Sequence, residues 1–320
     1  MTISSTDPPL LAIIGPTASG KSSLGVFLAK EFGGEVVACD STQLYRGFDV
    51  GTAKPTLAER SSVPHHLLDI LDPAEESTAG GYRERALKIL YDLRARSRPP
   101  IFTVGTGLYL RALLEGLAEL PLRSEELRER LRLSAAEYGP GHLHAMLARL
   151  DAQAARQISS ADEQKLIRAI EICLLARKPL TEIHRAGRTP LTGWRILKIG
   201  LQPERASLYD RIHKRTEAML QAGWLDEVSR LISSGLLENA KPFNFIGYRE
   251  LRSHLRGEIT LDAARAAIQQ GTRQYAKRQL TWFRREKDVH WLTGFGDDES
   301  LQSAARDWLN TQFAPDSSHS

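Results

Sequence analysis

Short apolar runs alternate with amphipathic segments over the first third of the chain. Residues 10–14, 36–39 and Pro100–Val104 form apolar runs, which is the pattern of strands buried on both faces of a parallel sheet. Between these runs, residues 22–30 and 82–96 carry apolar side chains at helical spacing. The alternation predicts an α/β fold in which helices flank a parallel sheet.

From residue 122 to residue 190 this alternation stops, and charged segments with helical periodicity take over. Helices are expected over residues 124–137, His142–Leu150 and 163–177. The sequence Ser160-Ala161-Asp162-Glu163 fits a capping box and marks the start of the last of these helices. We interpret residues 122–190 as an all-helical insertion domain that interrupts an α/β core.

The α/β core therefore consists of residues 1–121 and residues 191–310. In its second part, residues 195–200 predict a strand, residues 203–220 and 261–286 predict helices, and Val289–Leu292 predicts the last strand. Residues 311–320 are polar, and we expect them to form a disordered tail.

Composition is that of an ordinary globular protein, with 42% hydrophobic and 26% charged residues. No run approaches the ~20 apolar residues that span a bilayer, and the N-terminus lacks the pattern of a signal peptide. The two cysteines, Cys39 and Cys173, are expected to be buried thiols in a reducing compartment. We expect a cytoplasmic protein without a membrane partner.

Positive charge is concentrated near the C-terminus. The chain has a net charge of +4, and residues 241–290 contain 11 Lys and Arg against 5 Asp and Glu. This asymmetry favours a polyanionic partner such as a nucleic acid, although a solvated basic helix would give the same count. Arg273, Lys277 and Arg284 are spaced by four and seven residues, which predicts a basic stripe on one helix face.

A phosphate-binding motif follows the first predicted strand and opens the first predicted helix. The sequence is Gly15-Pro16-Thr17-Ala18-Ser19-Gly20-Lys21-Ser22, which fits G-x-x-x-x-G-K-[ST] at every position. Such a loop presents main-chain N–H groups at a helix N-terminus, and these suit a diphosphate. The Lys21 ammonium is expected to neutralise phosphate oxygens, and the Ser22 hydroxyl is expected to hold Mg²⁺.

Two further candidates follow predicted strands, where ligands gather in open parallel sheets. Asp40 follows the strand at 36–39, and Thr106 follows Pro100–Val104, ahead of a helix expected over residues 110–117. Arg211 and Arg215 lie four residues apart, so they share a helix face. That pair could grip a diphosphate or simply form exposed ion pairs. The adjacent His65 and His66 are interpreted as structural, because neighbouring side chains on an extended chain point in opposite directions.

These features alone leave several function classes open. A nucleotide or small-molecule kinase would use the same loop, with Asp40 activating an acceptor hydroxyl, but it would leave the basic C-terminal segment unexplained. A GTPase-type RNA-binding module would need a base-reading N-K-x-D sequence, which we do not find in a convincing place. Residues alone make kinase and transferase about equally favoured.

Several short motifs, in order along nearly the whole chain, resemble those of the tRNA dimethylallyltransferases, also called tRNA isopentenyltransferases. Besides the phosphate loop, they are DSTQ at 40–43 with Tyr45, GTAKP at 51–55, PHHLLD at 64–69, GTGLY at 105–109, QKLIR at 164–168, IGYR at 246–249 and KRQLTW at 277–282. The resemblance implies a phosphate-loop core and transfer of a dimethylallyl group from dimethylallyl diphosphate to N6 of adenosine 37. That adenosine lies next to the anticodon in tRNAs that read codons beginning with U.

The resemblance also implies roles for individual residues. Lys21, Arg215 and Mg²⁺ on Ser22 would stabilise the departing diphosphate, with Arg211 as a second arginine. Asp40 would accept the proton of the N6 amino group, and Thr106 would contact the adenosine. The tRNA-binding set is Asp40, Ser41, Thr42, Gln43, Thr106, Arg128, Gln164, Lys165, Leu166, Ile167, Arg168, Asn244, Phe245, Ile246, Gly247, Tyr248, Arg249, Lys277, Arg278, Gln279 and Arg284. Phe243, Phe245 and Tyr248 would stack on bases, with core packing equally open for Phe243 and Phe245, and the enzyme is expected to be a monomer.

Overall fold

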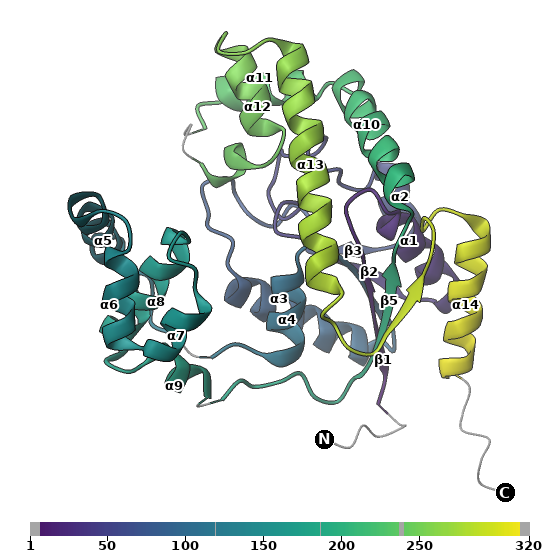
Figure 1. The fold of residues 1–320 in the computed structure, drawn as a ribbon. Helices are drawn as coiled ribbons and strands as arrows, with labels where there is room; N and C mark the ends of the chain where they lie inside the picture. The colour runs from purple at the N-terminus through teal and green to yellow at the C-terminus, as the bar shows by residue number, and fades with distance from the viewer. Residues whose placement is uncertain (1–6, 119, 186, 237–239, 314–320) are drawn as a thin grey trace, which may run out of the picture. The chain divides into compact units, whose positions relative to one another are not determined.

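The computed structural model describes residues 7–118, 120–185, 187–236 and 240–313 of the 320-residue chain (Figure 1). The chain divides into two compact units. One, the sheet unit, contains the residues up to 113 and those from 192 onward, and the other, the helical unit, is residues 114–191. In the part of the chain that the structure describes, no helix has the length and apolar character needed to cross a bilayer.

The sheet unit contains six parallel strands in the order β3-β2-β4-β1-β5-β6. They are β1 (Pro9–Ile14), β2 (Glu35–Cys39), β3 (His65–His66), β4 (Pro100–Val104), β5 (Arg195–Leu201) and β6 (Val289–Leu292). Val104 is in register with both Ile14 and Cys39, so β1, β2 and β4 end at the same level. The residues that follow these three strands are therefore delivered to one edge of the sheet.

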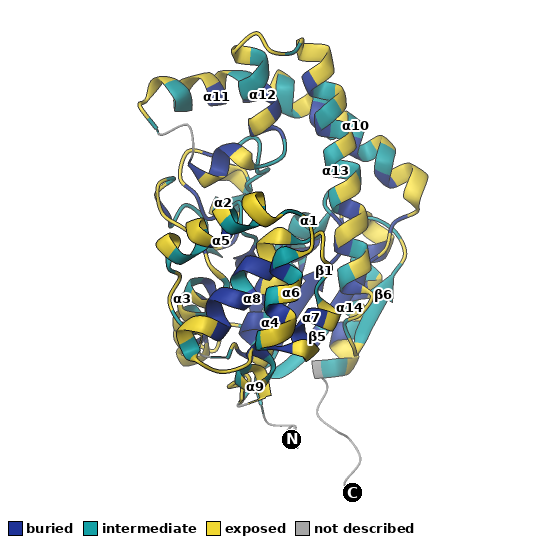
Figure 2. Ribbon diagram, turned by 60° about the vertical axis from the view of Figure 1, so that its left-hand side comes forward, coloured by how far each residue is buried: buried dark blue, intermediate teal, exposed yellow. Residues whose placement is uncertain are grey.

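Helices cover both faces of this sheet. The helices of the sheet unit are α1 (Lys21–Phe32), α2 (Leu57–Ser62), α3 (Ala79–Ala95), α4 (Gly107–Glu115), α10 (Arg205–Gln221), α11 (Trp224–Ser233), α12 (Tyr248–Leu255), α13 (Leu261–Phe283) and α14 (Glu299–Phe313), with a short 3₁₀ helix η1 (Lys241–Asn244). On one face, Leu24 and Leu28 of α1 and Leu301 of α14 pack against Ile13 and Ile199. Helices α1 and α14 lie side by side (Figure 1), and strands β1 and β2 are buried along nearly their whole length (Figure 2). The predicted α/β class with a parallel sheet is confirmed.

The helical unit is built from α5 (Glu125–Tyr138), α6 (His142–Leu150), α7 (Ala152–Gln157), α8 (Glu163–Ala176) and α9 (Leu180–Arg185). Its own core includes Leu131, Leu147, Ile170 and Cys173. This unit begins at residue 114, eight residues before the predicted insertion. Both cysteines are buried free thiols, as predicted.

Several predicted helix ends were wrong. Asp162 and not Ser160 caps α8, because its carboxylate accepts the Lys165 N–H at 3.2 Å. Helix α4 begins at Gly107, three residues earlier than expected. It ends at Glu115 and not at residue 117, because Gly116 has a φ of +79°, a left-handed conformation that terminates helices.

Near the C-terminus, α13 stops at Phe283, because the chain must turn back to add β6 beside β5. The predicted tail is helical as far as Phe313 in α14, a helix that the sequence analysis missed. Residues 314–320 lie outside the described part of the chain.

Candidate active site

The phosphate loop lies between β1 and α1, as its sequence predicts. Gly15 and Gly20 have φ values of +152° and +84°, which side-chain-bearing residues rarely adopt. A Cβ on Gly20 would also lie 2.6 Å from the Gly296 main-chain nitrogen. Gly20 precedes α1 without a side-chain cap, so the first N–H groups of the helix remain available to an anion.

Lys21 is the cation at the base of this loop. Its ammonium donates hydrogen bonds to the carbonyls of Gly15 at 3.0 Å and Pro16 at 2.7 Å. Burial lowers the pKa of Lys21 to about 7; the Asp40 carboxylate opposes that shift and the Arg215 guanidinium adds to it. Burial and neighbouring Arg211 likewise lower the pKa of Arg215. The site therefore holds more positive charge than Asp40 balances, which favours a bound anion.

Arg211 is held by the loop that precedes α14. Its guanidinium makes two hydrogen bonds to the Asp297 carboxylate, at 2.8 and 2.5 Å, and lies 4.5 Å from the Phe295 ring centroid. Gly296 of the same loop donates its N–H to the Ser19 carbonyl at 2.9 Å. The C-terminal loop thus supports the phosphate loop and fixes one of the two candidate arginines.

Asp40 and Thr106 come together at the ends of β2 and β4. One Asp40 carboxylate oxygen accepts hydrogen bonds from the Thr42 N–H at 2.8 Å and the Thr42 hydroxyl at 2.7 Å. The Thr106 hydroxyl accepts the Ser41 N–H at 3.0 Å. A Cβ on Gly105 would lie 1.9 Å from the second Asp40 oxygen, so only glycine leaves room for this carboxylate.

Gln279, which was expected to contact RNA, lines the smaller cavity and joins two segments of the site. The side chain is buried on α13, its carbonyl accepts the Thr17 N–H at 2.7 Å, and its amide donates to the Gly105 carbonyl at 2.8 Å. Gln279 therefore joins the phosphate loop to the segment that carries Thr106.

Two adjoining cavities occupy this edge of the sheet. The smaller, about 250 Å³, is lined by Lys21, Ser22 and Arg211. The larger, about 340 Å³, has an apolar side that includes Ile212, Met219, Trp224 and Ile268. They share the lining residues Thr17, Ala18, Asp40, Thr52, Arg215 and Tyr275. One continuous cleft thus connects a cationic end to a partly apolar end, with Asp40 on both.

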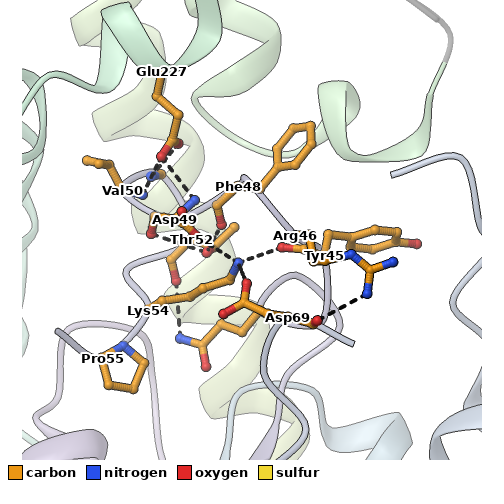
Figure 3. Close-up of polar contacts among 12 residues, drawn as sticks. Tyr45, Arg46, Phe48, Asp49, Val50, Thr52, Lys54, Pro55, Asp69 and Glu227 are labelled. Atoms are coloured by element: carbon orange, nitrogen blue, oxygen red, sulfur yellow. Dashed lines mark hydrogen bonds and ion pairs between the residues drawn. The ribbon is translucent and has the colours of Figure 1, made fainter. Parts of the chain in front are cut away.

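The wall of this cleft formed by residues 41–55 contains no long helix or strand, yet it is tightly hydrogen-bonded (Figure 3). Lys54, with a side chain 2% exposed, donates to the Tyr45 carbonyl and pairs with Asp49 and Asp69. The Gln43 amide donates to the carbonyls of Thr52 and Ala53. The sequence analysis had assigned no role to Lys54.

The remaining predicted RNA-binding residues are distributed over several elements. Ser41, Thr42, Asn244, Phe245, Ile246 and Arg278 line the larger cavity, and Gln43 lines the smaller one. Lys277 and Arg278 also line a shallow groove along α13 with Trp282, and Arg284 is exposed just beyond α13. Arg249 is paired with Glu250, and Gly247 precedes α12. Arg128, Gln164, Lys165 and Arg168 belong to the helical unit, where Arg168 pairs with buried Glu171.

Burial corrects the expected contacts of Tyr248, Leu166 and Ile167, and it assigns Phe243 to the core, the alternative that the sequence left open. Tyr248 and Phe243 are fully buried, and the Tyr248 hydroxyl donates to Glu227, so neither ring is free to stack on a base. Leu166 and Ile167 belong to the core of the helical unit. The half-buried Arg273 contacts the His213 ring of α10.

A metal ion at the phosphate loop would depend on oxygens from a ligand. Among the described residues, no group of three or more His, Cys, Asp or Glu side chains is arranged to hold a metal. The Ser22 hydroxyl lines the smaller cavity beside the phosphate loop, and Asp40 lines it too. This sparse set of hard oxygen donors fits Mg²⁺, which usually keeps several waters and binds through phosphate oxygens.

The adjacent histidines have structural roles. His66 pairs with Glu35 at 2.6 Å, and His65 contacts the Val63 carbonyl.

Comparisons with known proteins agree over nearly the whole chain. The IPP transferase family model matches residues 43–286, and the isopentenyl transferase model matches residues 8–69. The chain is 53% identical over 307 residues to a tRNA dimethylallyltransferase of Koribacter versatilis, covering 96% of this chain and 99% of the relative. A tRNA dimethylallyltransferase of Solibacter usitatus is 47% identical, with 93% and 97% covered.

Solved structures give the same result. The tRNA isopentenylpyrophosphate transferase of Bacillus halodurans superposes with a TM-score of 0.70 at 36% identity, covering 95% of this chain and 96% of that one. A eukaryotic dimethylallyltransferase acting on tRNA has a TM-score of 0.78 at 24% identity, covering 95% and 80%, and supports the fold.

Proposed function

Because the chain belongs to the tRNA dimethylallyltransferase family, we propose that its cleft carries dimethylallyl diphosphate at the cationic end and an extruded adenosine at the other. The observation that carries this proposal is the continuous cleft, in which Lys21 and Arg215 face the same space as Asp40. The reaction is transfer of the dimethylallyl group to N6 of the adenosine next to the anticodon, adenosine 37, in tRNAs that read codons beginning with U.

In the transfer step, the C–O bond of the donor breaks and a bond forms between the donor carbon and N6. The diphosphate leaves with the bonding electrons, and its added charge is stabilised by the phosphate-loop N–H groups, Lys21 and Arg215. Arg211 adds positive charge from beside Asp297. One proton of the N6 amino group passes to Asp40, whose carboxylate is oriented by Thr42. The products are N6-(dimethylallyl)adenosine, diphosphate and a proton.

Ser22 would hold Mg²⁺ together with diphosphate oxygens, and the ion would supply further charge stabilisation for the leaving group. Thr106, whose hydroxyl accepts the Ser41 N–H, would contact the adenosine. Because N6 is a poor nucleophile, much of the rate must come from alignment within the cleft. The base must leave its stack to enter, at a cost of a few kcal/mol.

RNA binding would use polar and charged residues of both units. In the sheet unit, Lys277, Arg278 and Arg284 present positive charge along and beyond α13. In the helical unit, Arg128, Gln164, Lys165 and Arg168 are the candidates. Cationic contacts of this kind hold the backbone of a single-stranded loop, while the splayed-out base is read inside the protein.

A direct test is to incubate the protein with unmodified tRNA, Mg²⁺ and dimethylallyl diphosphate, and to analyse the nucleosides by mass spectrometry. We expect one adenosine per tRNA to gain the mass of a five-carbon unit. A Lys21→Ala variant with retained fold is the matched control and should give no product. If the parent protein leaves adenosine unchanged but transfers phosphate from ATP, the kinase alternative replaces this proposal.

A further inference from the structure

A buried carboxylate with no part in the transfer chemistry contacts the wall of the cleft. Glu227 lies in the first turn of α11 and is 4% exposed. One of its oxygens accepts the N–H groups of Asp49 at 3.0 Å and Val50 at 2.8 Å. The other accepts the Tyr248 hydroxyl at 2.6 Å and the Gly51 N–H at 3.4 Å. Three consecutive main-chain N–H groups thus converge on one side chain.

The environment of Glu227 suits an ionised carboxylate. Consecutive N–H groups form a concave site that binds anions, and the N-terminus of α11 adds favourable dipoles. A neutral amide could still accept the Asp49 and Val50 N–H groups on its carbonyl oxygen, but its NH2 group would then face the Gly51 N–H, which would lose its acceptor. The second carboxylate oxygen and its negative charge therefore complete the set of contacts that holds the loop.

The same loop is held from its other end by a buried cation. Lys54 pairs with the Asp49 carboxylate at 2.7 Å, while the Asp49 N–H donates to Glu227. Asp49 is therefore fixed between two buried groups of opposite charge. Lys54 is close to it in sequence, and Glu227 is 178 residues away. Because this loop has little regular structure, these contacts are what keep it in one conformation.

The fixed loop is part of the cleft. Gly51 and Thr52 line the larger cavity, and Thr52 and Lys54 line the smaller one. Trp224 lies in the same helical turn as Glu227, and its ring packs against Gly51. A Cβ on Gly51 would lie only 2.1 Å from the Trp224 indole nitrogen. Glu227 thus holds the loop against the wall that α11 provides.

We propose that Glu227 is a positioning residue that fixes residues 49–51 and thereby places the adjoining Thr52 and Lys54, which line the donor end of the cleft. It touches no ligand and acts through the loop. Without the Glu227 contacts, the loop must become ordered when the donor binds, so the affinity for the donor falls. The rate of transfer from the bound donor stays the same. The kinetic part of this inference rests on the proposed function.

The test compares Glu227→Gln with the parent, at a temperature where both are folded. Amide hydrogen exchange of residues 49–51 should be about tenfold faster in the variant. KM for dimethylallyl diphosphate should rise about tenfold, with kcat within about threefold of the parent. Asp226→Asn, which removes an equal charge from an exposed position in the same turn, should change neither quantity.

Unchanged exchange at residues 49–51, or unchanged KM, overturns the proposal. A variant that only lowers Tm also overturns it, because that result assigns Glu227 to general stability. If Glu227→Gln does not fold, Tyr248→Phe removes one donor to the carboxylate and should give a smaller change in the same direction. If the parent transfers no dimethylallyl group, the proposed function fails, while the exchange measurement still decides the role of Glu227.

Discussion

Raising the pH from 7 to 9 should weaken the binding of dimethylallyl diphosphate ~50-fold, because Lys21 loses its proton over this range. In the ligand-free protein, burial lowers the pKa of Lys21 to about 7. A bound diphosphate places negative charge beside the ammonium and raises that pKa again, so the donor binds to the protonated form. Each pH unit well above 7 then costs about 1.4 kcal/mol of binding free energy, or tenfold in affinity.

Isothermal titration of the donor without RNA, at constant Mg²⁺ and between pH 6 and 9, measures this effect. Near pH 9, almost one proton should be taken up per donor bound, and titration in buffers of different protonation enthalpy detects it. The donor itself contributes little, since the terminal phosphate loses its last proton near pH 6. The ligand-free protein should also become more stable as the pH rises above 7. In the unfolded chain the pKa of Lys21 is near 10.5, so the unfolded chain keeps a proton that the folded protein has lost, and a rising pH then favours the folded state.

Lys21→Arg is the matched control, because a guanidinium stays protonated throughout this range. Its affinity for the donor is expected to be lower than that of the parent, owing to the larger side chain, but constant from pH 7 to 9. A flat profile in the parent, or an equal slope in the arginine variant, would show that Lys21 is not the titrating group.

Three further predictions concern the acceptor: two test residues of the cleft, and the third tests the surface along and beyond α13. Asp40→Ala should lower turnover by about 10²–10⁴-fold with tRNA binding nearly intact in a filter-binding assay, and unchanged turnover would remove Asp40 as the base. Gly105→Ala should lower kcat at least about tenfold with little change in donor affinity, because the added methyl group displaces the Asp40 carboxylate. A normal kcat in this variant would contradict the contact between residue 105 and Asp40. Replacing Lys277 and Arg284 with Ala should weaken tRNA binding and reduce its slope against log salt by about 1 for each lost phosphate contact, and a retained slope would place that surface away from RNA.

The parts of the fold that sequence predicted are those with local signals. The phosphate loop, β1 and α1 are specified by glycines and apolar residues within 24 positions, from Pro9 to Phe32. The ends of β2 and β4 were also predicted from the local sequence pattern, which placed Asp40 and Thr106 at one edge of the sheet. Short apolar runs between turn residues are enough to fix strands of this kind.

What the sequence did not predict depends on contacts between distant residues. Glu227 and the N–H groups that it binds are 176 to 178 residues apart, and Gln279 is 262 residues from Thr17. No spacing rule connects such positions, so Gln279 was placed on the RNA and Glu227 received no role. Tyr248 was misjudged for a related reason, because an aromatic residue in a basic segment looks the same in sequence whether it is exposed or buried.

The loop that precedes α14 has a consequence for how the enzyme is made. The glycine-rich segment is synthesised well before Gly296 and Asp297, which contact Ser19 and Arg211. Domains fold as units during synthesis, so a nascent chain that has not reached residue 297 has an unfinished donor pocket. Chains terminated before this loop should therefore be unable to sequester the isoprenoid donor, and a fusion placed directly after residue 298 would disturb catalysis.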